Sequence, residues 1–178
     1  MKTGLRTPLL RGITAWDQNR AGHMKFSARD DIEASIEDVF TALSDFEMFE
    51  RQAMRRGAEV VRADEAQQAG VGAAWRVAFM MRGRRRELNL QTVRFDDPNG
   101  MGFAAQSPGM DATFDVDLLA LSRTRTRMTV ALELKPLNLA SRLLVQSLKL
   151  AKSNLNNRFK QRVSEYCQML EDRLKRSA

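Results

Sequence analysis

Residues 139–174, LASRLLVQSLKLAKSNLNNRFKQRVSEYCQMLEDRL, decide the fold of this chain. Apolar side chains recur there every three or four residues, the spacing that places them on one face of an α-helix. The stripe consists of Leu144, Leu148, Ala151, Leu155, Phe159, Val163, Tyr166, Leu170 and Leu174. No proline or glycine interrupts the run, and Ser141 is a candidate N-cap. We therefore expect one continuous helix about 50 Å long.

Two structures accommodate such a helix: a coiled-coil arm, or a helix that lies against a sheet. The apolar stripe drifts around the helix and lacks a strict seven-residue repeat, which favours the sheet. The region before the helix supplies the strands, because apolar and polar residues alternate in several short segments. The predicted strands are 25–32, 58–63, 73–82, 87–95, 101–106 and a hairpin of two strands that turns around residues 122–124.

Two short helices are expected between the first and second strands. Ser35 and Asp38 form an S-x-x-D start, a variant of the capping box, before a helix that buries Val39 and Phe40. A second helix around Met48 should end at Gly57, a typical stop signal. The predicted order is therefore strand, two short helices, six strands and a long helix.

Charged residues mark two features of the sheet. Residues 82–86, RGRRR, are predicted to form an exposed basic turn. Asp115 and Asp117 share a parity opposite to the apolar residues, and Asp117 should lie diagonal to Arg127. Paired carboxylates sometimes serve acid–base catalysis, but this spacing favours a solvated cross-strand ion pair.

Composition sets limits on function. With 178 residues and 43% hydrophobic content, the chain should form one globular domain, and it contains no run of 18 apolar residues that would cross a membrane. The single cysteine, Cys167, excludes an internal disulfide and points to a reducing compartment, so we expect a cytoplasmic protein. The single histidine, His23, precedes the predicted domain, which excludes histidine triads and histidine zinc sites there. We expect no metal and no cofactor.

Residues 1–23 differ from the rest of the chain, and the domain is expected over residues 24–175. The segment is basic, and Leu5, Leu9, Ile13 and Trp16 would line one side of a short helix. A transit peptide, a membrane-surface anchor, a plain tail and an upstream start before Met24 all fit this composition.

The opening and closing segments of the domain resemble a known superfamily. Residues 32–40, IEASIEDVF, followed by LSD at 43–45, are similar to the "I-x-A-P-x-x-x-V-F … L-x-D" opening of the SRPBCC superfamily, with Ser35 where proline is usual. This superfamily comprises START-like and Bet v 1-like helix-grip domains, including polyketide cyclases and lipid-transport proteins. Residues 155–160, LNNRFK, fit its closing segment, and the resemblance covers about 85% of the chain.

The resemblance implies an α+β helix-grip fold, in which a curved antiparallel sheet of about seven strands wraps around the C-terminal helix and leaves a cavity between them. Its expected lining is Trp75, Val77, Phe79, Leu88, Leu90, Phe103, Val116, Met128, Val130, Leu148, Leu155 and Phe159. The alternative is that these side chains merely fill a core.

Three functions are then open. A binding module would hold a hydrophobic small molecule such as a lipid, an isoprenoid or quinone, or a polyketide. A cyclase- or dehydrase-type enzyme would need polar groups in the cavity, and Tyr166 and Arg76 are the candidates. A membrane-peripheral lipid carrier would dock on anionic lipids through residues 51–56 and 82–86, which are rich in arginine. Nucleic acid is not expected as a partner, and the oligomeric state is left open.

Overall fold

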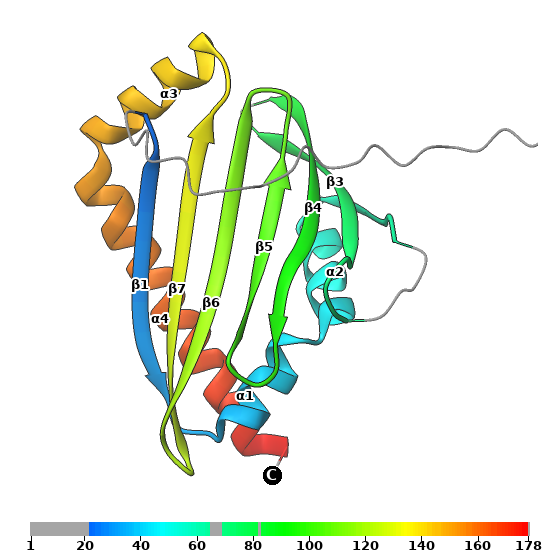
Figure 1. Cartoon of the computed structure of the whole chain (residues 1–178), viewed down its shortest axis with the longest axis vertical. Helices are drawn as coiled ribbons and strands as arrows, with labels where there is room; N and C mark the ends of the chain where they lie inside the picture. The colour runs from blue at the N-terminus through cyan, green and yellow to red at the C-terminus, as the bar shows by residue number, and fades with distance from the viewer. Residues whose placement is uncertain (1–21, 65–68, 82, 178) are drawn as a thin grey trace, which may run out of the picture.

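The computed structural model describes residues 22–64, 69–81 and 83–177 (Figure 1). The expected tail therefore lies outside the described residues, except for Gly22 and His23. The elements, in chain order, are β1 (Met24–Ile32), α1 (Ile36–Leu43), α2 (Phe46–Arg55), β2 (Glu59–Arg62), β3 (Ala74–Met81), β4 (Arg84–Asp96), β5 (Gly100–Gln106), β6 (Met110–Ser122), β7 (Arg125–Pro136), α3 (Leu139–Leu150) and α4 (Lys152–Ser177).

The strands form one antiparallel sheet in the order β1-β7-β6-β5-β4-β3-β2, and the helices lie on one face of it (Figure 1). Helix α4 packs along β1, α3 packs on β7, and α2 lies beside β2. The predicted helix-grip fold is confirmed. Within the described residues, none of the helices combines the length and apolar composition that a membrane crossing requires.

Both predicted short helices are present, and the first begins at the predicted Ser35 cap. The Ser35 hydroxyl accepts a hydrogen bond from the Asp38 backbone N–H at 3.2 Å and donates one to the Asp38 carboxylate at 2.6 Å. Asp45 caps α2 by accepting from the Met48 N–H at 3.0 Å. Gly57 follows α2 with a φ of +86°, a conformation that costs glycine little. Local chemistry thus fixes both helix starts.

The predicted long C-terminal helix is present, but it is not continuous, because the run divides at Ala151 into α3 and α4. The N-cap of α3 is Asn138, whose side chain accepts from the Ser141 N–H at 2.9 Å, so Ser141 is not the cap. Leu144 and Ala151 are exposed, while Val145 is buried. The division lets α3 turn onto β7 while α4 continues along β1. Tertiary packing sets this bend, and no helix-breaking residue marks it.

Two predictions about charged residues are also wrong. The basic turn is shorter than expected, because residues 84–86 belong to β4 and extend the β3–β4 hairpin. Asp117 lies diagonal to Arg127 as predicted, but the two do not form the expected ion pair, because Asp117 accepts a hydrogen bond from Arg94 at 2.7 Å. Arg127 instead bonds Asp31 at 2.7 Å, because the β1–β7 register places Asp31 directly opposite it. A directly opposite partner is closer than a diagonal one.

Candidate functional site

The inner face of the sheet, which the helices cover, carries the predicted cavity residues. Strand pairing places Trp75 opposite Leu90, Val77 opposite Leu88, and Val116 opposite Val130, so these side chains share that face. The three helix residues of the prediction pack toward the same face in the hydrophobic core. The predicted set divides by burial into fully buried residues, which fill the core, and half-buried residues.

The helices cover the inner face of the sheet to different degrees at the two ends of the strands. At one end, which we call the α1 end, β1 ends at Ile32 and β5 begins at Gly100, and the inner side chains are buried, among them Trp75, Met101 and Met128. At the other end, the α3 end, β7 ends at Pro136 and β4 begins at Arg84. Here the inner side chains of β3 to β6 are only partly buried, whereas Met24 and Phe26 of β1 are buried against α3 and α4.

We call the half-covered residues of four adjacent strands the apolar face; they are Phe79, Leu88, Leu90, Phe103 and Phe114. Phe103 and Phe114 pair across β5 and β6, with ring centroids 6.2 Å apart. Phe114 retains 37% of its surface exposed, an unusual degree for an inward-facing phenylalanine. The predicted lining omits Phe114, although its parity with Val116 would have revealed it. The apolar face is the candidate site.

Two buried hydroxyl groups lie in the same layer. Thr92 is opposite Phe103 on the inner face and fully buried, and its Oγ1 has no hydrogen-bond partner among the described residues. The same holds for the Oη atom of Tyr166 on α4, a residue that packs against the main core. Burial raises the pKa of Tyr166 to about 12, so its hydroxyl is protonated at neutral pH and serves as a donor.

The structure separates the two candidate catalytic residues. Arg76 is exposed and lies on the outer face, because its neighbour Trp75 points inward and successive side chains in a strand alternate. Tyr166 lies on the helix side of the sheet. The two candidates therefore do not converge on one site, as an enzyme of the cyclase type would require, and the alternation of residues 75–79 in the sequence already indicates the placement of Arg76.

A polar network at the edge of the core fastens α2 to the sheet. The Arg62 guanidinium lies 4.6 Å from the centre of the Trp75 ring and donates to Glu50 at 3.2 Å. The Trp75 indole N–H donates to the same Glu50 carboxylate at 2.5 Å. Asp64 accepts from Arg62 and from the Ala74 N–H. Sequence analysis missed this network, because its members are far apart in the chain.

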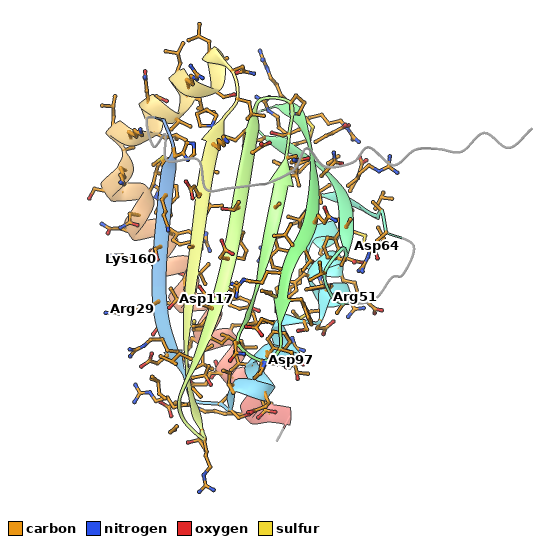
Figure 2. The ribbon with its side chains drawn as sticks, viewed as in Figure 1. Arg29, Arg51, Asp64, Asp97, Asp117 and Lys160 are labelled. Atoms are coloured by element: carbon orange, nitrogen blue, oxygen red, sulfur yellow. The ribbon has the colours of Figure 1, made fainter. Side chains whose placement is uncertain are left out.

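Polar recesses run along the junction of β1 and α4. The larger, of about 770 Å³, is lined by residues that include Asp30, Thr129 and Lys160, and the smaller, of about 320 Å³, by Asp31, Arg127 and their neighbours. Figure 2 shows Arg29 and Lys160 at this edge of the molecule. Both recesses contain charged side chains, unlike the apolar face. Within the described part of the chain, no three His, Cys, Asp or Glu side chains converge as metal ligands.

Comparison with solved structures places this geometry in a known fold. A protein from Thermus thermophilus superposes with a TM-score of 0.59 at 17% identity, covering 87% of this chain and 99% of that one. The Zhui aromatase/cyclase from a Streptomyces species gives 0.60 at 10% identity, covering 85% and 96%. Truncated norcoclaurine synthase from Thalictrum flavum gives 0.55 at 12% identity, covering 71% and 82%.

No protein-family model and no curated protein sequence matches the chain. The solved structures share little sequence identity with this chain, so the matches show its fold alone. The sheet, the two short helices after β1 and the C-terminal helices nevertheless agree with the resemblance that residues 32–45 indicate. The chain therefore has a helix-grip fold, the fold that the resemblance of residues 32–45 implies.

Proposed function

We propose that the protein binds a hydrophobic small molecule, of the lipid, isoprenoid, quinone or polyketide class, on the apolar face between the sheet and the C-terminal helices. One observation carries the proposal: on β3 to β6, aromatic and aliphatic side chains on the helix-covered side of the sheet stay half-exposed at the α3 end, while those at the α1 end are buried. Apolar surface left accessible inside a concave fold is typical of ligand sites.

The buried hydroxyls give the proposed ligand site its polar contacts. A mostly apolar ligand with one oxygen would accept a hydrogen bond from Thr92 or Tyr166, whose hydroxyls have no partner among the described residues. Ligand pockets combine an apolar lining with a few such groups. Two similar structures support this ligand class, because one is an aromatase/cyclase and another is norcoclaurine synthase.

Fluorescence titration of the delipidated full chain with a fluorescent fatty-acid analogue tests the proposal. We expect saturable binding of one probe per chain. Phe114→Ser should weaken it by about tenfold, because the substitution removes apolar contact area. Leu119→Ser is the matched control, since Leu119 lies on the outer face of β6 and is 58% exposed. Uptake that never saturates, or equal losses in both variants, would refute the site.

A further inference from the structure

Helix α3 carries a second apolar stripe that faces away from the protein. Leu139, Leu143 and Leu150 are 73%, 58% and 92% exposed. Their spacing of four and seven residues places them on one side of the helix, and the buried Val145 and half-buried Leu148 lie on the opposite side. Three exposed leucines on one helix face are not needed for the fold, because α3 already packs through its other side.

The charged residues in the stretch of sequence around this stripe are all basic. Residues 135–164 contain seven cations and no aspartate or glutamate; the cations are Lys135, Arg142, Lys149, Lys152, Arg158, Lys160 and Arg162. These seven equal the net charge of +7 of the whole chain, since the other 22 basic residues match the 22 acidic residues in number. Arg142 and Lys149 belong to α3 itself, and both are exposed. Lys135, Arg142, Lys149 and Lys152 therefore lie on or next to the helix that carries the exposed leucines.

We infer that the outer side of α3 docks on an anionic lipid membrane. A helix with leucines on one side and cations beside them lies in the interfacial plane of a bilayer, with the leucines among the acyl chains and the cations at the headgroups. Electrostatic repulsion disfavours two other partners for this helix face, a second copy of the chain and the chain's own residues 1–21. A second copy of the chain would bring two basic surfaces together, and residues 1–21 carry a net charge of +3 themselves.

The location of α3 gives the docking a consequence for the ligand site. Pro136 pairs with Met110 at the end of β7, and the β3–β4 hairpin turns between Met81 and Arg84 at the same end of the sheet. In an orientation docked through α3, the membrane therefore lies at the same end of the sheet as the half-covered apolar face (Figure 1). This orientation rests on the proposed function, whereas the docking itself does not.

Vesicle flotation of the full chain tests the inference. We expect the protein to float with phosphatidylcholine vesicles that contain about 30% phosphatidylglycerol, to float far less with phosphatidylcholine alone, and to detach as salt rises. The variant Leu139→Ser/Leu143→Ser/Leu150→Ser should lower the bound fraction by about tenfold or more. The control Leu119→Ser/Leu121→Ser changes exposed leucines on the outer face of β6 and should float as the wild type does.

A second variant separates charge from apolar contact. Arg142→Gln/Lys149→Gln keeps the leucines and should weaken flotation by about tenfold, with a smaller salt dependence. A wild type that does not bind the anionic vesicles, or a triple serine variant that floats unchanged, overturns the inference. So does a wild type that is dimeric by light scattering while the triple serine variant is monomeric, because the stripe would then be a subunit interface. The fatty-acid titration with the same variants reports on the ligand site separately.

Discussion

Phe103 and Phe114 face each other across β5 and β6 on the helix-covered side of the sheet, with their ring centroids 6.2 Å apart, and Phe114 is 37% exposed. Rings at this distance stabilise each other, and the exposed part of Phe114 offers the same contact to a ligand. At the other end of the sheet, Phe46 and Trp75 form an edge contact at 5.2 Å and both are buried. The sheet therefore combines a packed core with an apolar face that the helices leave half-exposed.

Filling the apolar face should block the ligand without unfolding the protein. Ala105 lies opposite Leu90 on the inner face and is half-buried. Ala105→Phe should lower probe affinity by about tenfold and keep or raise the melting temperature, because the new ring covers accessible apolar surface. Thr113→Phe, on the outer face of β6, is the control and should leave affinity unchanged. Equal affinity for the Ala105 variant and the wild type would place the ligand elsewhere.

The contact between α4 and the sheet should account for much of the stability. Leu170 is 1% exposed in the main core, and Leu170→Ala should lower the free energy of unfolding by about 2–5 kcal/mol through lost burial and a cavity. The neighbouring Met169 is 46% exposed, and Met169→Ala should cost less than about 1 kcal/mol. Urea denaturation of both variants checks this. Similar losses would show that α4 is not held by its predicted face.

The Tyr166 hydroxyl should not contribute to the stability of the ligand-free protein. Because that hydroxyl is buried without a partner among the described residues, Tyr166→Phe should leave the free energy of unfolding unchanged or raise it by about 1 kcal/mol. Tyr166 is the only tyrosine, so an absorbance titration reports on it alone, and its transition should lie near pH 12. A transition near pH 10 would mean that the hydroxyl is solvated.

The Asp64 carboxylate should stabilise the fold at neutral pH and lose that effect in acid. Arg62 and the Ala74 N–H lower its pKa from 3.8 to about 2. Because folding lowers this pKa, the Asp64 carboxylate stabilises the folded state by about 2 kcal/mol at pH values above its pKa in the unfolded chain. This contribution disappears as the pH falls from about 4 to 2. The difference in unfolding free energy between wild type and Asp64→Asn should follow that course.

Asp117 provides a matched control for the Asp64 titration. Its ion pair with Arg94 lies on the outer face, where the Asp117 side chain is 61% exposed. Asp117→Asn should therefore cost less than about 1 kcal/mol at neutral pH. If Asp64→Asn were as mild as Asp117→Asn at pH 7, the network around Arg62 would not contribute to stability.

Sequence patterns predict the features that local chemistry determines. The Ser35 cap, the Gly57 stop and the alternation of residues 75–79 each depend on a few neighbouring residues, and the structure agrees with them. The bend at Ala151 could not be predicted, because it depends on how α3 reaches β7 while α4 packs along β1. The partners of Asp117 and Arg127 depend on strand register in the same way.

The sequence predicts which residues face the candidate site, but it does not predict how much of that site the helices cover. Alternation selects the inward-facing residues, among them Trp75 and Phe79, but does not tell which of them the helices cover. Coverage depends on the position of α4 beside β1, which leaves the inner face of β4, β5 and β6 less covered toward the α3 end. The network of Arg62, Glu50 and Asp64 was equally hidden, because three separate segments bring it together.

Nuclear magnetic resonance of the leucine methyl groups in the presence of a spin-labelled fatty acid tests the central claim most directly, because the spin label broadens resonances only near itself. We predict that saturating ligand broadens Leu88 and Leu90 of the apolar face and leaves Leu119 and Leu121 of the outer face sharp. Broadening at Leu119 and Leu121, with Leu88 and Leu90 unaffected, would contradict the proposed site.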